Sequence, residues 1–129
     1  MSKFKIDKIF KKAKETLTEN EKVKGLISEV KDKVEEINSD SDERTTFIYQ
    51  LQVIIRMVRA HINGSYRAFS ATTILTLVFA LVYFITPIDL IPDFIPALGL
   101  TDDISLVYFI FKSLADDIAK FRVWEEANA

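Results

Sequence analysis

The uncharged stretch AFSATTILTLVFALVYFITPI, residues 68–88, decides the fold class of this chain. As one α-helix its 21 residues would measure roughly 30 Å, which is about the thickness of the hydrocarbon core of a bilayer. Ser70, Thr72, Thr73 and Thr76 dilute its first half, but hydroxyl groups bond back to helical carbonyls and suit helix contacts in lipid. The stretch therefore predicts a helix that is long enough to span a membrane.

All three prolines of the chain lie close together at the end of this stretch, and they predict a break in the helix. Thr86 is expected to cap a new short turn, with Pro87 as its first residue and Asp89 near its amino end, where a carboxylate favours the helix dipole. Pro92 and Pro96 keep the residues before them out of the helical conformation. We therefore expect a structured turn and not one continuous helix.

A second apolar helix is expected to follow this turn, over about residues 104–115. Gly99 offers a left-handed backbone position, and Thr101, Asp102 and Asp103 are predicted to cap the new helix. The two helices would then form an apolar helical hairpin.

The uncharged part of the second helix, residues 104–111, is too short to span a bilayer alone. Lys112 must be hidden, extend to the interface or keep this helix partly outside the hydrocarbon. Tyr108 and Trp124 are candidate anchors at the membrane interface.

The composition indicates one small, all-α protein without catalytic machinery. The 129 residues suffice for a single domain. The chain has no cysteine, and its one histidine, His61, stands near a helix end, where we expect it to face solvent or the helix dipole. No nucleophile elbow, phosphate-binding glycine loop, metalloprotease helix or nucleic-acid fold signature is present. We therefore expect no enzyme, no cofactor and no specific nucleic-acid partner.

Residues 1–40 are expected to form a charged helical region that is separate from residues 41–129. Its first helix, over about residues 3–17, is basic and amphipathic, so it can lie on an anionic lipid surface or dock on neighbouring helices. A second amphipathic helix follows, and the polar linker at 38–42 separates both from a third helix that ends at Asn63–Gly64. Few contacts are expected to cross the linker. This region is our candidate for binding a protein partner, while the pattern specifies no oligomeric state.

The run TPIDLIPDFIPALGLTDD, residues 86–103, closely resembles the signature of the YkvA-like family, DUF1232, a group of small, mostly prokaryotic proteins. The resemblance covers roughly residues 73–114. It implies an α-helical hairpin domain that is commonly predicted to be membrane-embedded, and it implies no established reaction, cofactor or substrate. The lysine-rich amino-terminal half lies outside the resemblance. The residues to which we assign a structural role in the turn are Thr86, Pro87, Asp89, Pro92, Asp93, Pro96, Gly99, Asp102 and Asp103.

The favoured hypothesis is a non-enzymatic membrane protein whose hairpin lies in the bilayer and whose charged amino-terminal region is cytoplasmic. Basic residues flank the hairpin on both sides, whereas the turn is acidic. Positive charge near membrane segments tends to stay in the cytoplasm, so both termini are expected there. The flanking residues are Arg56, Arg59, Arg67, Lys120 and Arg122.

Two alternatives remain open on the sequence. In the first, residues 68–88 form the most buried helix of a soluble bundle that acts as an interaction module, because a fully surrounded helix is also apolar all round. In the second, Asp89, Asp93, Asp102 and Asp103 bind magnesium or calcium, for which oxygen ligands are suited. Capping of backbone amides accounts for the same carboxylates without a metal.

Overall fold

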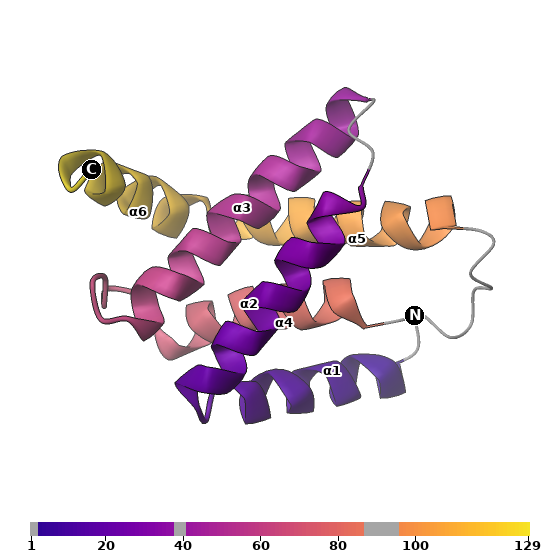
Figure 1. Cartoon of the computed structure of the whole chain (residues 1–129), viewed down its shortest axis with the longest axis horizontal. Helices are drawn as coiled ribbons and strands as arrows, with labels where there is room; N and C mark the ends of the chain where they lie inside the picture. Colours follow the sequence, from indigo (N-terminus) through magenta and orange to yellow (C-terminus); the bar gives the residue numbers. More distant parts are fainter. Residues whose placement is uncertain (1–2, 38–40, 87–95) are drawn as a thin grey trace.

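The structure is a computed structural model in which residues 3–37, 41–86 and 96–129 are described. These residues form helices joined by short connections, and they contain no strand. The all-α fold class predicted from the sequence is therefore confirmed. The helices are α1 (Lys3–Thr16), α2 (Asn20–Glu35), α3 (Asp42–Ile62), α4 (Ala71–Ile85), α5 (Pro96–Ser113) and α6 (Ala115–Ala127), as Figure 1 shows.

Short polar side chains set the ends of the two central helices. The Ser41 hydroxyl accepts a hydrogen bond from the Arg44 amide at 3.2 Å and caps α3. The predicted end of this helix is confirmed, since Asn63 is its C-cap residue. Gly64 follows with a φ of 82°, a conformation that glycine adopts without strain. The Ser70 hydroxyl accepts from the Thr73 amide at 3.1 Å and caps α4.

The cap at Ser70 makes α4 shorter than the apolar stretch that contains it. The helix has 15 residues, which corresponds to about 22 Å. The predicted single helix over 68–88 is wrong at its amino end, because the hydroxyl of Ser70 closes the first turn there. At the other end α4 stops at Ile85, as the predicted break at Thr86 requires, and the Thr86 hydroxyl donates to the carbonyl of Val82 at 2.6 Å. Among the residues described, no helix combines the length and the apolar content needed to cross a bilayer.

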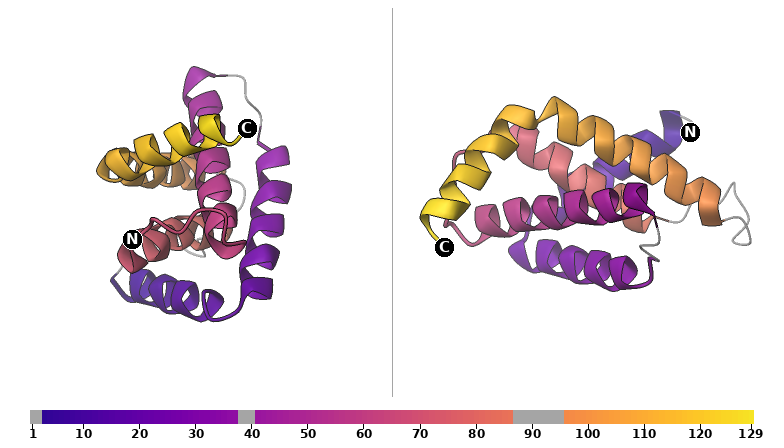
Figure 2. Two further views of the ribbon diagram at one scale, coloured as in Figure 1. Left: turned by 90° about the vertical axis from the view of Figure 1, so that its left-hand side faces the viewer. Right: turned by 90° about the horizontal axis from the view of Figure 1, so that it is seen from above.

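Helix α4 is the central element of the fold. Ten of its 15 residues are buried, and α1, α2, α3 and α5 all pack against it. In Figure 1, α4 lies between α1 and α5, and the end view in Figure 2 shows α2 and α3 covering a further side. The most apolar helix of the chain is thus enclosed by the other helices.

The amino-terminal helices share one hydrophobic core with the rest of the chain. Ile9 and Ala13 of α1 belong to the same buried cluster as Leu77 and Leu81 of α4. The rings of Phe10 and Phe79 stack at 4.3 Å. Contacts between the regions on either side of the linker are therefore numerous, contrary to our expectation. Whether residues 41–129 fold without residues 1–40 is a separate question, which truncation of the chain tests.

Helix α5 begins earlier than predicted. It starts at Pro96, which suits the first turn of a helix because its missing amide would have no partner there. Gly99, Thr101, Asp102 and Asp103 therefore lie inside α5 and not at a cap before it. The predicted turn residues Pro87, Asp89, Pro92 and Asp93 lie outside the described residues. Helices α4 and α5 pack together, as a helical hairpin requires.

Candidate functional site

The outer face of α5 carries two adjacent exposed aromatic side chains. Phe109 is 68% exposed and Tyr108 58% exposed. Ser105 and Lys112 are also exposed, and these four positions share one side of the helix because residues three or four apart are neighbours. We refer to Ser105, Tyr108, Phe109 and Lys112 as the α5 surface.

The opposite face of α5 is fixed in the core. Val107 and Ile110 are almost fully buried, and α5 packs on both α3 and α4. The helix is therefore apolar on two sides, only one of which is covered by the fold. Adjacent exposed aromatic residues of this kind are typical of surfaces that meet a membrane or another protein.

One end of the α5 surface borders an open groove of about 460 Å³ beside the first turns of α3. Asp42 and Glu43 line it together with Tyr108 and Ser105. These two carboxylates lie in the first turn of α3, where they favourably meet the positive end of the helix dipole. Their position is thus explained by the helix, without a ligand.

Polar contacts hold α6 against the helices that carry this site. The hydroxyl of Thr73 donates to the Asp117 carboxylate at 3.0 Å, which joins α4 to α6. The Arg56 guanidinium binds Glu125 through two nitrogens, at 2.8 and 3.3 Å, which joins α3 to α6. Two planar groups paired through two bonds define orientation better than a single contact does.

The basic residues predicted to flank a membrane hairpin lie in several different surroundings in the structure. Arg56 is paired with Glu125, and Arg122 lies over the Tyr49 ring at 5.6 Å. Arg59 instead lines a groove between α2 and α3. Of the two candidate anchors, Tyr108 is exposed, whereas Trp124 is partly buried and packs against Tyr66 and Phe121.

The exposure of Phe109 was not predicted from the sequence. Ser105 and Lys112, which lie four and three residues away on the same side of the helix, are the signal that marks its face as outward. In the sequence Phe109 lies between other apolar residues, and this pattern alone indicates a buried position.

His61 lies in the last turn of α3, near the helix end as predicted, and its side chain is partly buried. Its Nδ1 atom has no contact with solvent and no hydrogen-bond partner. Burial, together with the positive charge of Arg67, lowers the pKa of the imidazole below its ordinary value.

The carboxylates considered for ion binding are not brought into a described site. Asp89 and Asp93 lie outside the described residues, and Asp102 and Asp103 belong to the first turns of α5. Within the ranges that the structure describes, no group of three or more histidine or carboxylate side chains is arranged to hold a metal ion.

Comparisons with known proteins identify relatives of the hairpin. Residues 73–110 match a family described as protein of unknown function (DUF1232), a segment that includes most of α4 and the exposed pair Tyr108 and Phe109. The chain is 30% identical over 81 residues to the uncharacterized membrane protein YkvA of Bacillus subtilis (strain 168), and this match covers 63% of the chain and 76% of the relative. No solved structure gives a significant match.

Proposed function

Because this chain belongs to the YkvA-like DUF1232 family, we propose that it is a non-enzymatic, membrane-associated protein that lies on the bilayer surface through the α5 surface. The observation that carries the proposal is the exposed pair Tyr108 and Phe109 on an otherwise packed helix. The family relative in Bacillus subtilis, which is described as a membrane protein, supports the same conclusion.

The chemistry of the α5 surface suits the boundary between lipid headgroups and acyl chains. Aromatic rings are favoured at that depth, with the apolar ring directed to the hydrocarbon. Lys112 lies three residues after Phe109, so its ammonium group can extend toward lipid phosphates while its stem remains in contact with apolar surface. The buried core of the bundle keeps its own packing in this arrangement.

A second apolar contact is needed for stable binding. Burying a phenylalanine ring contributes about 1.5–3 kcal/mol, and one such anchor gives only reversible association. The signature residues 87–95 directly precede α5 in the chain and contain Ile88, Leu90, Ile91, Phe94 and Ile95. We assign the second membrane contact to this segment on the basis of its sequence.

Surface binding also places both chain termini on one side of the membrane. Thirteen of the 17 Lys and Arg residues precede position 61, and excess positive charge is a property of cytoplasmic segments. The charged region of α1 and α2 then faces the cytoplasm, where it remains available to a protein partner.

Vesicle flotation of the purified full chain tests the proposal. Phe109→Ser should weaken binding to vesicles of anionic and zwitterionic lipid by about tenfold or more, since it removes the burial of one aromatic ring. Val123→Ser is the matched control, because Val123 of α6 is also 68% exposed but lies outside the α5 surface. Equal binding by both variants, or no binding by the parent protein, would contradict the proposal.

Alkaline carbonate washing of cell membranes tests the surface topology separately. A surface-bound protein should be released into the supernatant, whereas a spanning protein stays in the pellet. Retention after the wash would show that the membrane contact is deeper than proposed.

The alternative function, an interaction module, uses the same exposed residues with a protein as the partner. The vesicle assay separates the two, because it contains no other protein. If the chain does not bind lipid vesicles but forms a complex with another protein through Phe109, the result would support the interaction module.

A further inference from the structure

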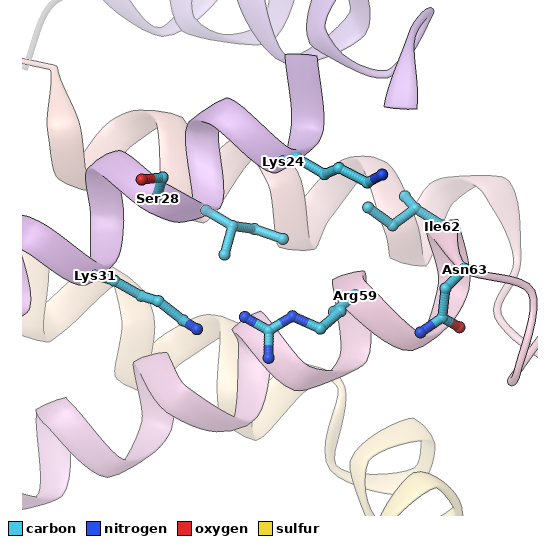
Figure 3. A pocket seen from close by; sticks show the side chains of 7 residues that line it. Lys24, Ser28, Lys31, Arg59, Ile62 and Asn63 are labelled. Atoms are coloured by element: carbon cyan, nitrogen blue, oxygen red, sulfur yellow. The ribbon is translucent and has the colours of Figure 1, made fainter. Parts of the chain in front are cut away.

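A second surface feature lies between α2 and α3, away from the α5 surface. It is an open groove of about 470 Å³ lined by Lys24, Ile27, Ser28, Lys31, Arg59, Ile62 and Asn63. Figure 3 shows the lysines extending from α2 and the arginine from α3, with their charged ends directed to the space between the helices. Three cations of two helices thus meet in one groove.

This concentration of positive charge is local. The whole chain carries a net charge of −2, yet no acidic residue lines the groove. The groove between α1, α2 and α4 contains Glu29 beside Lys8 and Lys12, and the groove at α3 and α5 contains Asp42 and Glu43. The α2–α3 groove differs from both because its cations are not balanced by a carboxylate in the lining.

Two of the three cations also lack an acidic partner elsewhere in the described part of the chain. Neither Lys31 nor Arg59 has a carboxylate within salt-bridge distance among those residues. Lys24 contacts Glu21 at 3.4 Å, but both side chains are well exposed, and exposed pairs of this kind exchange readily for another anion. Holding like charges on facing helices without a counterion costs energy, and a bound anion removes that cost.

The remaining lining completes a site for a phosphate group. The side-chain amide of Asn63 can donate hydrogen bonds to phosphate oxygens, whereas the hydroxyl of Ser28 is directed away from the labelled cations in Figure 3. A guanidinium binds two such oxygens at once, and the lysines add point charges on the other side. Ile27 and Ile62 form an apolar floor that suits the uncharged part of a phosphate ester.

We propose that the α2–α3 groove binds a phosphate-bearing anion, held by Arg59 and Lys31 with Lys24 at its edge. The free phosphate ester and the lipid headgroup share this chemistry. Figure 2 shows α2 and α5 on opposite sides of α3, so a bilayer at the α5 surface lies away from the groove. This placement of the bilayer rests on the proposed function. It indicates that the phosphate group belongs to a dissolved compound and not to a lipid headgroup.

Inorganic pyrophosphate is the probe, with binding to the full chain followed by calorimetry and by the rise in melting temperature that a ligand of the folded state produces. Arg59→Gln and Lys31→Gln should each weaken binding by about tenfold or more, since each removes a charge-assisted contact. Lys22→Gln is the matched control, because this exposed lysine of α2 changes the net charge equally but does not line the groove. Both groove residues are exposed, so their variants should remain folded.

Absence of pyrophosphate binding by the parent protein in the millimolar range, together with unchanged vesicle binding by the groove variants, would overturn the proposal. Equal weakening by Lys22→Gln would also overturn it, because the interaction would then depend on overall charge. Binding to anionic vesicles that is lost in Arg59→Gln and Lys31→Gln would support the phosphate site and assign its source to a lipid headgroup. Phe109→Ser should leave pyrophosphate binding unchanged, so failure of the groove and failure of the α5 surface give different results.

Discussion

Helices α4 and α5 are neighbours in the hairpin, but they meet their surroundings in opposite ways. Helix α4 has the more apolar sequence and is enclosed by four other helices, so that Leu77, Val78, Ala80 and Leu81 have no exposure. Helix α5 is less apolar, contains Lys112, and leaves its two aromatic neighbours open to the outside.

The difference shows that hydropathy alone does not tell which helix presents apolar side chains at the surface of the fold. An apolar helix whose neighbours supply complementary apolar faces is used by the core, whatever its resemblance to a membrane span. An apolar residue on the uncovered side of a mixed helix is the more informative signal, because the fold gives it no internal partner. Three kinds of change test the comparison: deletion of the helices that cover α4, substitution of side chains in α4 and α5, and protonation of His61 near the start of the segment that leads into α4.

Removal of residues 1–40 should have the largest effect. The deletion uncovers the sides of α4 that α1 and α2 protect, so residues 41–129 are expected to lose cooperative thermal unfolding or to aggregate. The apolar side chains withdrawn from the shared core are Ile9, Ala13, Val23, Leu26, Ile27 and Val30. Circular dichroism melts and light scattering provide the measurement.

A protease site placed in the linker is the control for this deletion. Cleavage there should leave the two fragments associated and the melt nearly unchanged, because packing and not chain connection holds the helices together. A truncated chain that melts as cooperatively as the parent would instead establish residues 1–40 as a separate folding unit.

Two single substitutions sharpen the contrast between the helices. Leu81→Ala, at a fully buried position of α4, should lower the free energy of unfolding by about 2–5 kcal/mol through lost burial and the cavity left behind. Phe109→Ala, on the α5 surface, should change it by less than about 0.5 kcal/mol. Urea denaturation of both variants measures the difference. Similar losses at the two positions would mean that Phe109 is packed in solution and that the α5 surface is not free.

Local sequence patterns were sufficient for the helical class and for several helix ends. The Asn63–Gly64 end of α3 and the break at Thr86 both follow from side chains that act within one turn of the helix. The cap at Ser70 was missed because four hydroxyl residues in an apolar run also fit a continuous helix. Pro96 was interpreted as a breaker, although proline equally suits the start of a helix, and α5 begins there.

Contacts between distant segments were beyond the reach of the same patterns. Apolar residues recur every three or four positions in α1 and α2, which indicates that each helix has an apolar face to bury. The pattern does not identify α4 as the helix that covers this face. The same limit applies to the α2–α3 groove, where Lys31 and Arg59 meet only because two helices pack side by side. Surface sites made by two elements require the packing to be known first.

The smallest expected effect concerns His61, whose ring lies 6.4 Å from that of Phe69 in the segment that leads from α3 to α4. Its Nδ1 atom is buried without a partner, so a proton added there would be a donor with no acceptor. The pKa of this histidine is therefore lower in the folded chain than the ordinary value of 6.5 expected for the unfolded chain.

The sign of the pH dependence follows from that direction. At neutral pH both states are largely uncharged at His61; as the pH falls through about 6.5 the unfolded chain takes up a proton that the folded chain does not, so stability decreases and then levels off below the folded pKa. Urea denaturation from about pH 7 to pH 5.5 should show this decrease, because His61 is the sole histidine of the sequence and carboxylates titrate mainly below this window. His61→Gln should remove most of the slope, and Arg67→Gln should reduce it by removing the nearby positive charge that contributes to the lowered pKa. If the pH dependence of the free energy of unfolding persists in His61→Gln, another group is responsible for it. Protonation of His61 would then not affect stability at the connection between α3 and α4.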